Sequence, residues 1–239
     1  MYVPGKDAMD AIEDGAADFA VLPIENSSAG AVNEVYDLLV EYENYIVGET
    51  VLPVSHVLAG LKGSKEDEIT RVYSHPQGLM QCEKYLYDHP AMEKISVPNT
   101  AVAARKIVEE QDVHHAAICS AYAASLYGLE ILREQVNDNR HNSTRFIIVT
   151  NQKIFLEHAD KISICFELPH ESGSLYQILS HFIYNDLNMT KIESRPIEDR
   201  PWEYRFFVDF EGNLADGGVK NAIRGLREET KSMKILGNY

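Results

Sequence analysis

The sequence predicts an α/β protein in two parts, one from residue 6 to about 150 and one from residue 161 to 239. In the first part, helix-like amphipathic stretches alternate with short apolar runs, an order typical of an α/β domain with mostly parallel strands. Residues 151–160, NQKIFLEHAD, have no sustained period and therefore predict a linker. After this linker the pattern changes to strand, helix, two strands, helix and strand.

The apolar runs of the first part are short, and each passes into a polar turn. They predict strands at residues 19–22, 46–52, 71–74, 95–97, 116–119 and 146–150. Amphipathic stretches predict helices at residues 31–40, 76–87 and 100–110. Because ligands of open α/β sheets gather at the carboxyl ends of strands, the polar residues after these runs are the candidate site residues.

The sequence pattern of the second part predicts a βαββαβ unit. Its strands are expected at residues 161–167, 189–195, 202–210 and 233–236, with one helix opened by Ser172 and Gly173 and another at 217–231. This order is the ferredoxin-like plan, a layer of helices on an antiparallel sheet. The plan by itself indicates no function.

Composition excludes some classes of partner. The chain of 239 residues is 45% hydrophobic and carries a formal net charge of −15, which argues against nucleic acids and anionic membranes. The first residues lack a basic segment followed by an apolar core, and no run approaches the roughly 18 apolar residues that span a bilayer. These features predict a cytoplasmic protein that meets any anionic ligand with a local cluster of donors.

The three cysteines have no paired spacing. Cys82, Cys119 and Cys165 lie far apart, which favours reduced, buried thiols over disulfides or a zinc site. We therefore expect no metal.

Two segments place small polar residues where a strand passes into a helix. Residues 22–30 include Asn26 and Ser27, which could form an anion site, although such residues at this place are more often ordinary helix caps. Residues 73–82 repeat this design with Ser74. Gln81 lies four residues after Gln77, so on a helix their amides would share one face.

Two further residues carry chemistry with alternatives open. His75 could act as a general acid, although a histidine beside a helix start is more often structural. Thr144 supplies a hydroxyl that can donate to a leaving oxygen, and Arg145 could pair with a carboxylate. Residues 138–140 are typical of a turn.

Taken together, several segments resemble the motif set of prephenate dehydratases. The matching segments are Pro23-Ile24-Glu25-Asn26-Ser27, Ser74-His75-Pro76-Gln77, Asn99-Thr100-Ala101-Val102-Ala103-Ala104, residues 116–129 and Thr144-Arg145-Phe146. The resemblance covers residues 6 to 150 and assigns 1–152 to a dehydratase domain. Gly173-Ser174-Leu175-Tyr176 and Glu193-Ser194-Arg195-Pro196 are similar to the two effector motifs of the family's ACT domain, here residues 161–239.

The resemblance implies a two-lobed dehydratase domain, similar to periplasmic-binding-protein-like folds, with the active site in the cleft between the lobes. Residues up to about 52 and from about 138 to 152 would form one lobe. It implies conversion of prephenate to phenylpyruvate, water and carbon dioxide without a cofactor, because aromatisation supplies a large driving force. Thr144 would donate the proton, and Asn26, Ser27, Ser74, Gln81 and Arg145 would bind substrate. Glu25 would orient a neighbour or stay protonated beside the dianionic substrate.

The ACT resemblance implies phenylalanine as an effector, bound where two such domains meet. The implied effector-binding residues are Gly173, Ser174, Leu175, Glu193, Ser194 and Arg195. The protein would then be a homodimer or homotetramer. Ser174 and Tyr176 replace smaller residues of the family motif, which puts the choice or affinity of the effector in question.

The chain differs at its start from the family that it resembles. Only residues 1–5 precede the family segment at 7–12, where relatives have a strand and a glycine- and serine-containing turn. Without that piece we expect an exposed sheet edge, and either a truncated sequence or a shortened form of the protein. Two functional alternatives follow: a non-catalytic phenylalanine-binding sensor, and an arogenate dehydratase with the same chemistry on an aminated substrate.

Overall fold

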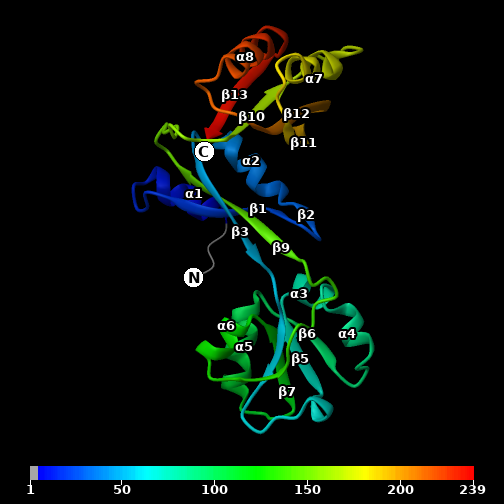
Figure 1. The fold of residues 1–239 in the computed structure, drawn as a ribbon. Coiled ribbons are helices and arrows are strands. Elements are labelled where there is room, and N and C mark those ends of the chain that lie inside the picture. The colour runs from blue at the N-terminus through cyan, green and yellow to red at the C-terminus, as the bar shows by residue number, and fades with distance from the viewer. Residues whose placement is uncertain (1–4) are drawn as a thin grey trace. The chain divides into compact units, whose positions relative to one another are not determined.

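The computed structural model describes residues 5–239, which fold into two compact units (Figure 1). The discontinuous unit comprises residues 5–52 and 144–239, and the middle unit comprises residues 53–143. The predicted α/β class with two lobes and a βαββαβ segment is confirmed. The short N-terminal segment at residues 1–4, on which the predicted departure from the family rests, lies outside the described residues.

The second boundary between the units lies later than the predicted limit near residue 138. Asn137 and Asp138 bind the middle unit, because their side chains accept hydrogen bonds from the backbone N–H groups of His56 and Lys84. The N–H of Val54 also donates to the carbonyl of Asn142, and the middle unit extends to Ser143.

The first lobe of the discontinuous unit is a sheet packed against two helices. Its elements are α1 (Gly5–Glu13), β1 (Ala20–Asn26), β2 (Gly30–Ala31), α2 (Asn33–Glu41), β3 (Tyr45–Pro53) and β9 (Ser143–Thr150). Alternate residues of β1 are buried, so that Leu22 and Ile24 share a core with Met9 of α1 and Leu39 of α2. Strand β1 pairs antiparallel with both β2 and β9, and the prediction of mostly parallel strands is therefore wrong for this lobe.

The middle unit contains a five-stranded sheet in the order β6-β5-β7-β4-β8. Its elements are β4 (Val57–Gly60), a 3-10 helix (Glu66–Glu68), β5 (Arg71–Ser74), α3 (Pro76–Met80), α4 (Glu83–Tyr87), β6 (Glu93–Ser96), α5 (Thr100–Glu110), β7 (His115–Cys119), α6 (Ala121–Leu126) and β8 (Glu130–Arg133). Strand β5 pairs parallel with β6 and β7, as predicted, whereas β4 pairs antiparallel with β7 and β8. Every residue of β7 is buried, as expected for a central strand.

The predicted helix at 76–87 is interrupted between α3 and α4. The carbonyl of Gln81 accepts a hydrogen bond from the N–H of Asp138, at 2.8 Å, instead of continuing the helix. The carboxylate of Asp138 then accepts from the N–H of Lys84 in the first turn of α4. Because a distant loop satisfies these groups, the interruption leaves no signal in the local sequence.

The C-terminal segment has the predicted βαββαβ order. Its elements are β10 (Lys161–Glu167), α7 (Ser174–Tyr184), β11 (Met189–Ile197), β12 (Arg200–Glu211), α8 (Gly217–Glu229) and β13 (Ser232–Asn238). The bounds of β10 agree with the prediction. Phe166, Phe182, Phe210 and Leu226 are almost completely buried in a core formed by this segment.

The sheet of the C-terminal segment continues into the first lobe. The strands run β11-β12-β10-β13-β3-β9-β1-β2 in one eight-stranded sheet. Strands β13 and β3 meet in parallel where Gly237 lies opposite Ile46. The opposite face of the segment also shares a core with the lobe, since Phe207 contacts Tyr36 edge to face at 4.9 Å. The domain limits 1–152 and 161–239 stay a prediction.

None of the helices within residues 5–239 is both long and apolar enough to cross a lipid bilayer.

The junction between β13 and β3 predicts a requirement for glycine at position 237. A methyl group at Gly237 would overlap the backbone carbonyl oxygen of Ile46. We expect Gly237→Ala to lower the free energy of unfolding by about 1–3 kcal/mol, the usual cost of overpacking, as measured by denaturant titration. Gly217→Ala is the matched control, because a methyl group there meets no atom within 4 Å. Equal stability of the two variants would contradict this role.

Candidate functional site

Strands β1 and β9 bring Asn26 and Thr144 together. The two residues are directly opposite in the antiparallel register, and the Asn26 Nδ2 donates to Thr144 Oγ1 at 3.0 Å. The Asn26 Oδ1 accepts from the backbone N–H groups of Ser28 and Ala29, at 3.0 and 2.9 Å. These bonds fix the orientation of the amide. Because Thr144 accepts from Asn26, its own hydroxyl hydrogen stays available for another acceptor.

The turn after β1 differs from the predicted helix start. Residues 27–29 form the turn between β1 and β2, and α2 begins only at Asn33, after Val32 as the N-cap. Neither Ser27 nor Ser28 is therefore a cap of this helix. Ser27 is exposed in the turn beside the Asn26–Thr144 pair. Its contact with substrate stays a prediction.

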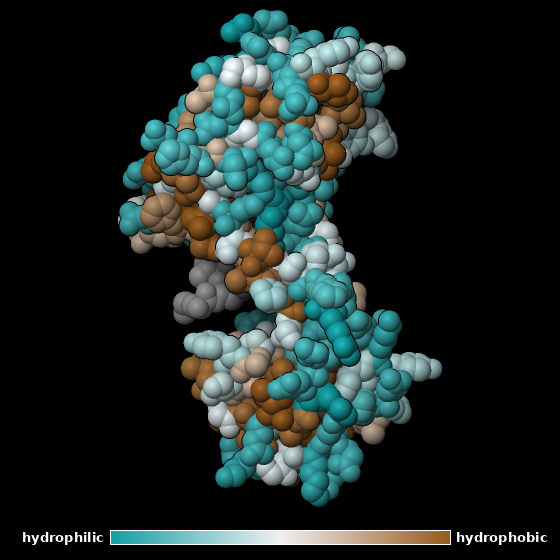
Figure 2. Space-filling model, viewed as in Figure 1, coloured by the Kyte–Doolittle hydropathy of each residue, from teal (hydrophilic) through white to brown (hydrophobic). Residues whose placement is uncertain are grey.

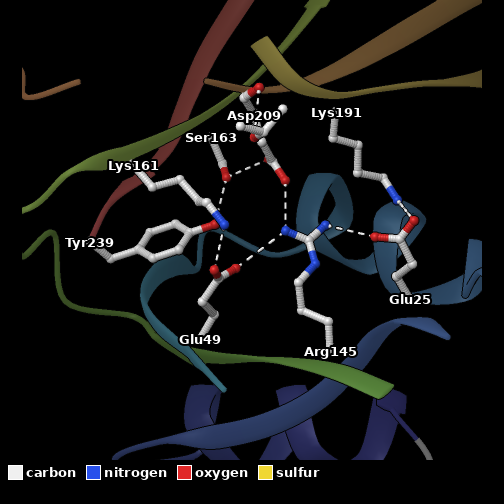
Figure 3. Close-up of polar contacts among 9 residues, drawn as sticks. Glu25, Glu49, Arg145, Lys161, Ser163, Lys191, Asp209 and Tyr239 are labelled. Atoms are coloured by element: carbon white, nitrogen blue, oxygen red, sulfur yellow. Dashed lines mark hydrogen bonds and ion pairs between the residues drawn. The ribbon is translucent and has the colours of Figure 1, made fainter. Parts of the chain in front are cut away.

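Arg145 is the centre of a network of charged side chains (Figure 3). Its Nη2 donates to Glu25 at 3.1 Å, and its Nη1 donates to Glu49 at 3.2 Å and to Asp209 at 3.0 Å. The three carboxylates come from β1, β3 and β12, and 15% of the Arg145 side chain is exposed. One guanidinium therefore joins the first lobe to the C-terminal segment.

Two lysines complete this network. Lys191 Nζ lies 2.9 Å from Glu25 Oε1, and Lys161 pairs with Glu49. The charge network is thus three carboxylates, Glu25, Glu49 and Asp209, balanced by three cations, Arg145, Lys161 and Lys191. The balance matters because a buried charge without a partner is costly.

Two neutral hydroxyl groups extend the network behind Asp209. Ser163 Oγ donates to Asp209 Oδ1 at 2.6 Å and lies 2.8 Å from the hydroxyl of Tyr239. Both oxygens of the Asp209 carboxylate are therefore occupied, one by Ser163 and the other by Arg145.

The charge states in the network follow from these contacts. Burial alone would raise the pKa of Glu25, but Lys191 and Arg145 hold it below its ordinary value. Burial would lower the pKa of Arg145, but Asp209 and Glu49 raise it above its ordinary value. Glu25 is therefore ionised, and the expectation that it stays protonated is wrong. The other expectation, that Glu25 orients a neighbour, agrees with its contact with Arg145.

The sequence did not reveal most members of the network. Glu49, Lys161, Lys191 and Asp209 lie on strands far apart in sequence, and only the pairing of the sheet brings them to Arg145. A weak signal was present in β11, where charged residues alternate with uncharged ones. A contact between Arg145 and substrate stays a prediction, while internal carboxylates occupy both of its terminal nitrogens.

In the middle unit, Ser74 and Gln81 lie at the two ends of α3. Ser74 is completely buried, and its hydroxyl donates to the carbonyl of Ile118 at 2.8 Å. Gln81 is partly exposed, and its Oε1 lies 3.1 Å from His56 Nε2. The substrate contacts predicted for both residues stay predictions.

His56 orients the side chain of Gln81, a role that the sequence did not indicate. It is 8% exposed, and burial lowers the pKa of its imidazole below the ordinary value. A neutral imidazole with its hydrogen on Nε2 donates to Gln81 Oε1, which leaves the amide hydrogens of Gln81 for another acceptor. His56 lies just before β4, a strand that the apolar pattern did not predict, so no period pointed to it.

His75 begins α3 as its N-cap. Its Nδ1 accepts a hydrogen bond from the backbone N–H of Gln77 at 3.2 Å. This geometry supports the structural alternative for His75.

The first predicted effector motif borders a pocket. Gly173, at φ 87°, is the N-cap of α7, and Ser174 Oγ donates to the carbonyls of Pro169 and Glu171. The pocket beside it has a volume of about 380 Å³, and its lining includes Leu175, Trp202 and residues 168–172.

The second predicted effector motif lies on β11, outside the lining of that pocket. Its Arg195 forms a bidentate ion pair with Asp37 of α2, at 3.1 and 2.7 Å. The pocket beside the first motif therefore does not include the second motif.

The cysteines are free and buried, as predicted. Burial raises the pKa of Cys82 and Cys119 to about 12 and that of Cys165 to about 11. Such thiols are poor nucleophiles at neutral pH. Within residues 5–239, no three His, Cys, Asp or Glu side chains are grouped so as to hold a metal ion.

Comparison with known proteins gives consistent matches. The family model for prephenate dehydratase matches residues 3–154. A bifunctional chorismate mutase/prephenate dehydratase of Pseudomonas aeruginosa is 39% identical over 226 residues, which cover 94% of this chain and 61% of that protein. An arogenate dehydratase/prephenate dehydratase of Arabidopsis thaliana, a chloroplastic protein, is 41% identical over 97% of this chain and 60% of its own length.

A solved structure is similar over nearly the whole chain. The prephenate dehydratase of Arthrobacter aurescens in complex with L-Phe has a TM-score of 0.88 and 32% identity, covering 98% of this chain and 78% of that one. The chain thus spans about three fifths of the length of the two curated relatives and more of this solved one.

The buried, neutral His56 predicts a specific pH dependence of stability. Because its pKa is lowered in the folded state, the unfolded chain binds more protons as the pH falls below about 6.5. The free energy of unfolding should therefore fall as the pH is lowered from 7.5 to 5.5. His56→Gln should remove the contribution of His56 to this change with pH. Denaturant titration at several pH values measures it, with the exposed His141→Gln as control. Parallel pH profiles for wild type and His56→Gln would contradict the assignment.

Proposed function

Because the chain belongs to the prephenate dehydratase family, we propose that it converts prephenate to phenylpyruvate, water and carbon dioxide. The observation that carries the proposal is the Asn26–Thr144 pair. It combines a hydroxyl with a free hydrogen and an amide whose orientation is fixed by the following turn. Both residues belong to the part of the chain that matches the family model.

In the proposed reaction, Thr144 donates a proton to the departing ring hydroxyl. The bond between the ring and its carboxylate breaks, and carbon dioxide leaves. The electron pair of that bond completes the aromatic ring as the carbon–oxygen bond breaks, and the oxygen leaves as water with the proton from Thr144. Thr144 then recovers a proton from solvent. The hydrogen bond from Asn26 stabilises negative charge on the Thr144 oxygen, which makes the hydroxyl a better acid.

Recognition of a dianionic substrate by a protein with a net charge of −15 requires local donors. We assign this role to Asn26, Ser27 and Gln81. Ser74 donates its hydroxyl to the carbonyl of Ile118 and Arg145 is bound by internal carboxylates, so these two predicted residues would support the site and not donate to substrate. Among the assigned donors, Gln81 is supported by its contact with His56, which occupies the amide oxygen and leaves the amide hydrogens to donate. Aromatisation drives the reaction, and the proposed chemistry includes no cofactor.

We assign residues 1–152 to the dehydratase domain and residues 161–239 to an ACT domain that binds phenylalanine. The complex of the Arthrobacter aurescens protein with L-Phe supports this choice of effector. The proposed binding residues are Gly173, Ser174, Leu175, Glu193, Ser194 and Arg195. Since the pocket beside the first motif does not include the second, we propose that two copies complete the site.

We propose a cytoplasmic homodimer or homotetramer, and the surface of the C-terminal segment supports assembly. Strand β11 is an edge of the eight-stranded sheet, with unpaired backbone groups available to a second strand. Apolar side chains gather over α7 and its neighbouring strands (Figure 2). The exposed ones include Ile183 at 70%, Trp202 at 77% and Ile192 at 45%. An apolar region of this kind marks an interaction surface.

Two alternatives remain as outcomes of the tests. Arogenate dehydration uses the same bond changes on an aminated substrate, and the name of the Arabidopsis thaliana relative includes both activities. A non-catalytic phenylalanine sensor would bind phenylalanine and turn over neither substrate.

The proton-donor role predicts the effect of two substitutions at position 144. Thr144→Val keeps the shape and removes the hydroxyl, and kcat should fall about 10²- to 10⁴-fold. Thr144→Ser keeps the hydroxyl and should retain a large part of the activity. The assay follows phenylpyruvate from prephenate and, in parallel, phenylalanine from arogenate. Equal activity of wild type and Thr144→Val would exclude the role, and phenylalanine binding without turnover in wild type would favour the sensor.

The proposed interface predicts the effect of a charge on the edge strand. Ile192→Lys places an ammonium group among apolar side chains, so sedimentation analysis should show weaker self-association and calorimetry weaker phenylalanine binding. Val113→Lys is the matched control, since Val113 is 41% exposed but belongs to the middle unit. An unchanged sedimentation coefficient for Ile192→Lys would place the interface elsewhere.

A further inference from the structure

We propose that Glu25 and Arg145 are positioning residues for the Asn26–Thr144 pair, and that Lys191 and Asp209 make this positioning depend on the C-terminal segment. This inference deepens the proposed function and rests on it for the roles of Thr144 and phenylalanine. The positioning itself, and its link to the C-terminal segment, rest on the geometry of the discontinuous unit. The four residues Glu25, Arg145, Lys191 and Asp209 are called the ionic bridge below.

The bridge begins at the strand pair that carries the proposed acid. In the register of β1 and β9, Glu25 lies opposite Arg145, and Asn26 lies opposite Thr144 on the next pair along. Successive residues of a strand point to opposite faces, so the ion pair and the Asn26–Thr144 pair occupy opposite faces and share one stretch of backbone. Any displacement of Glu25 or Arg145 therefore moves Asn26 or Thr144.

A bulge interrupts the pairing of this stretch of β1 with β9. The register with β9 shifts between Pro23 and Glu25, which leaves Ile24 as an extra residue. A bulge interrupts the hydrogen-bond ladder, and Pro23 contributes no backbone N–H to it. Strand β2 still pairs with this end of β1, and the 3.1 Å pair between Glu25 and Arg145 adds a side-chain contact where the ladder between β1 and β9 is interrupted.

The other half of the bridge is a second pair of opposite residues. Lys191 of β11 lies opposite Asp209 of β12 in the antiparallel register. Lys191 binds Glu25 at 2.9 Å, while Asp209 binds Arg145 at 3.0 Å. Each strand pair thus contributes one cation and one anion, and every ion contacts its opposite across the space between the pairs (Figure 3).

Lys191 connects this bridge to the strand of the second effector motif. Lys191, Glu193 and Arg195 lie at alternate positions of β11, and all three are partly buried, so they share a face. Arg195 binds Asp37 in α2, and the Lys191 side chain is only 11% exposed, with its ammonium 5.5 Å from the ring centre of Tyr36. Ion pairs to the first lobe therefore flank Glu193 on both sides. A ligand that displaces β11 near residues 193–195 must also displace the partner of Glu25.

Lys191→Met tests the bridge, because it keeps the apolar stem and removes the charge. We measure kcat and KM with and without phenylalanine, and phenylalanine binding by calorimetry. The change in kcat that phenylalanine causes should shrink about 2- to 30-fold, the range for single substitutions along a coupling network, while phenylalanine still binds. Lys191→Arg keeps the charge and should restore the response.

The matched control is Lys231→Met. Lys231 pairs with Glu203 at 3.0 Å within the C-terminal segment, so this substitution removes an ion pair that does not reach the first lobe. The control should respond to phenylalanine as wild type does. A phenylalanine response of Lys191→Met equal to that of the control would overturn the proposal.

A second measurement does not depend on turnover. Hydrogen exchange of the backbone amides of residues 25, 26, 144 and 145 should change when phenylalanine binds wild type, and should change much less in Lys191→Met. The proposal is overturned if phenylalanine leaves these exchange rates unchanged in wild type. It is also overturned if phenylalanine changes them equally in wild type and Lys191→Met. A wild-type chain that binds phenylalanine without turnover refutes the proposed enzyme, yet this measurement still decides the bridge.

Discussion

The guanidinium of Arg145 imposes the constraint on which the discontinuous unit depends. A buried cation must be surrounded by acceptors, and here those acceptors arrive from β1, β3 and β12. Three carboxylates around one cation would leave excess negative charge, which Lys161 and Lys191 offset. The relative placement of these strands is consequently specified by charge as well as by apolar packing. Removing Glu25, Glu49 or Arg145 would leave Lys191, Lys161 or Asp209, respectively, without its ionic partner.

The backbone supports the same arrangement independently. The close approach of β13 to β3 at Gly237 extends one sheet from the edge strand β11 to the hairpin of β1 and β2. Apolar contacts such as that of Phe207 with Tyr36 fill the space beside the charges. The Asn26–Thr144 pair therefore belongs to a sheet that reaches the predicted effector motif at 193–195. Regulation of the proposed chemistry by the C-terminal segment requires no contact between phenylalanine and the substrate.

Local patterns in the amino-acid sequence predicted part of this structure. The apolar alternation located β10, and the polar turn after the first strand, together with the motifs, pointed to Asn26 and Thr144. Local patterns could not predict contacts between residues far apart in sequence. The interruption at Gln81 depends on Asp138, and the pairing of Lys191 with Glu25 depends on the order of strands far apart in sequence. The charge of Glu25 was ambiguous in the sequence for the same reason, because its cations come from β9 and β11. His56 lacked any periodic signal, and only the fold places it against Gln81.

The most direct test of the central claim is a double-mutant cycle between Asp209 and Thr144, measured on kcat/KM for prephenate. Asp209→Asn weakens the hold on Arg145, and Thr144→Ser keeps the hydroxyl while altering how it is held. If Asp209 acts through Arg145 on the position of Thr144, the two effects will differ from additivity by at least about 0.5 kcal/mol. Additive effects, within about 0.3 kcal/mol, would contradict the claim that the charge network positions the proposed acid.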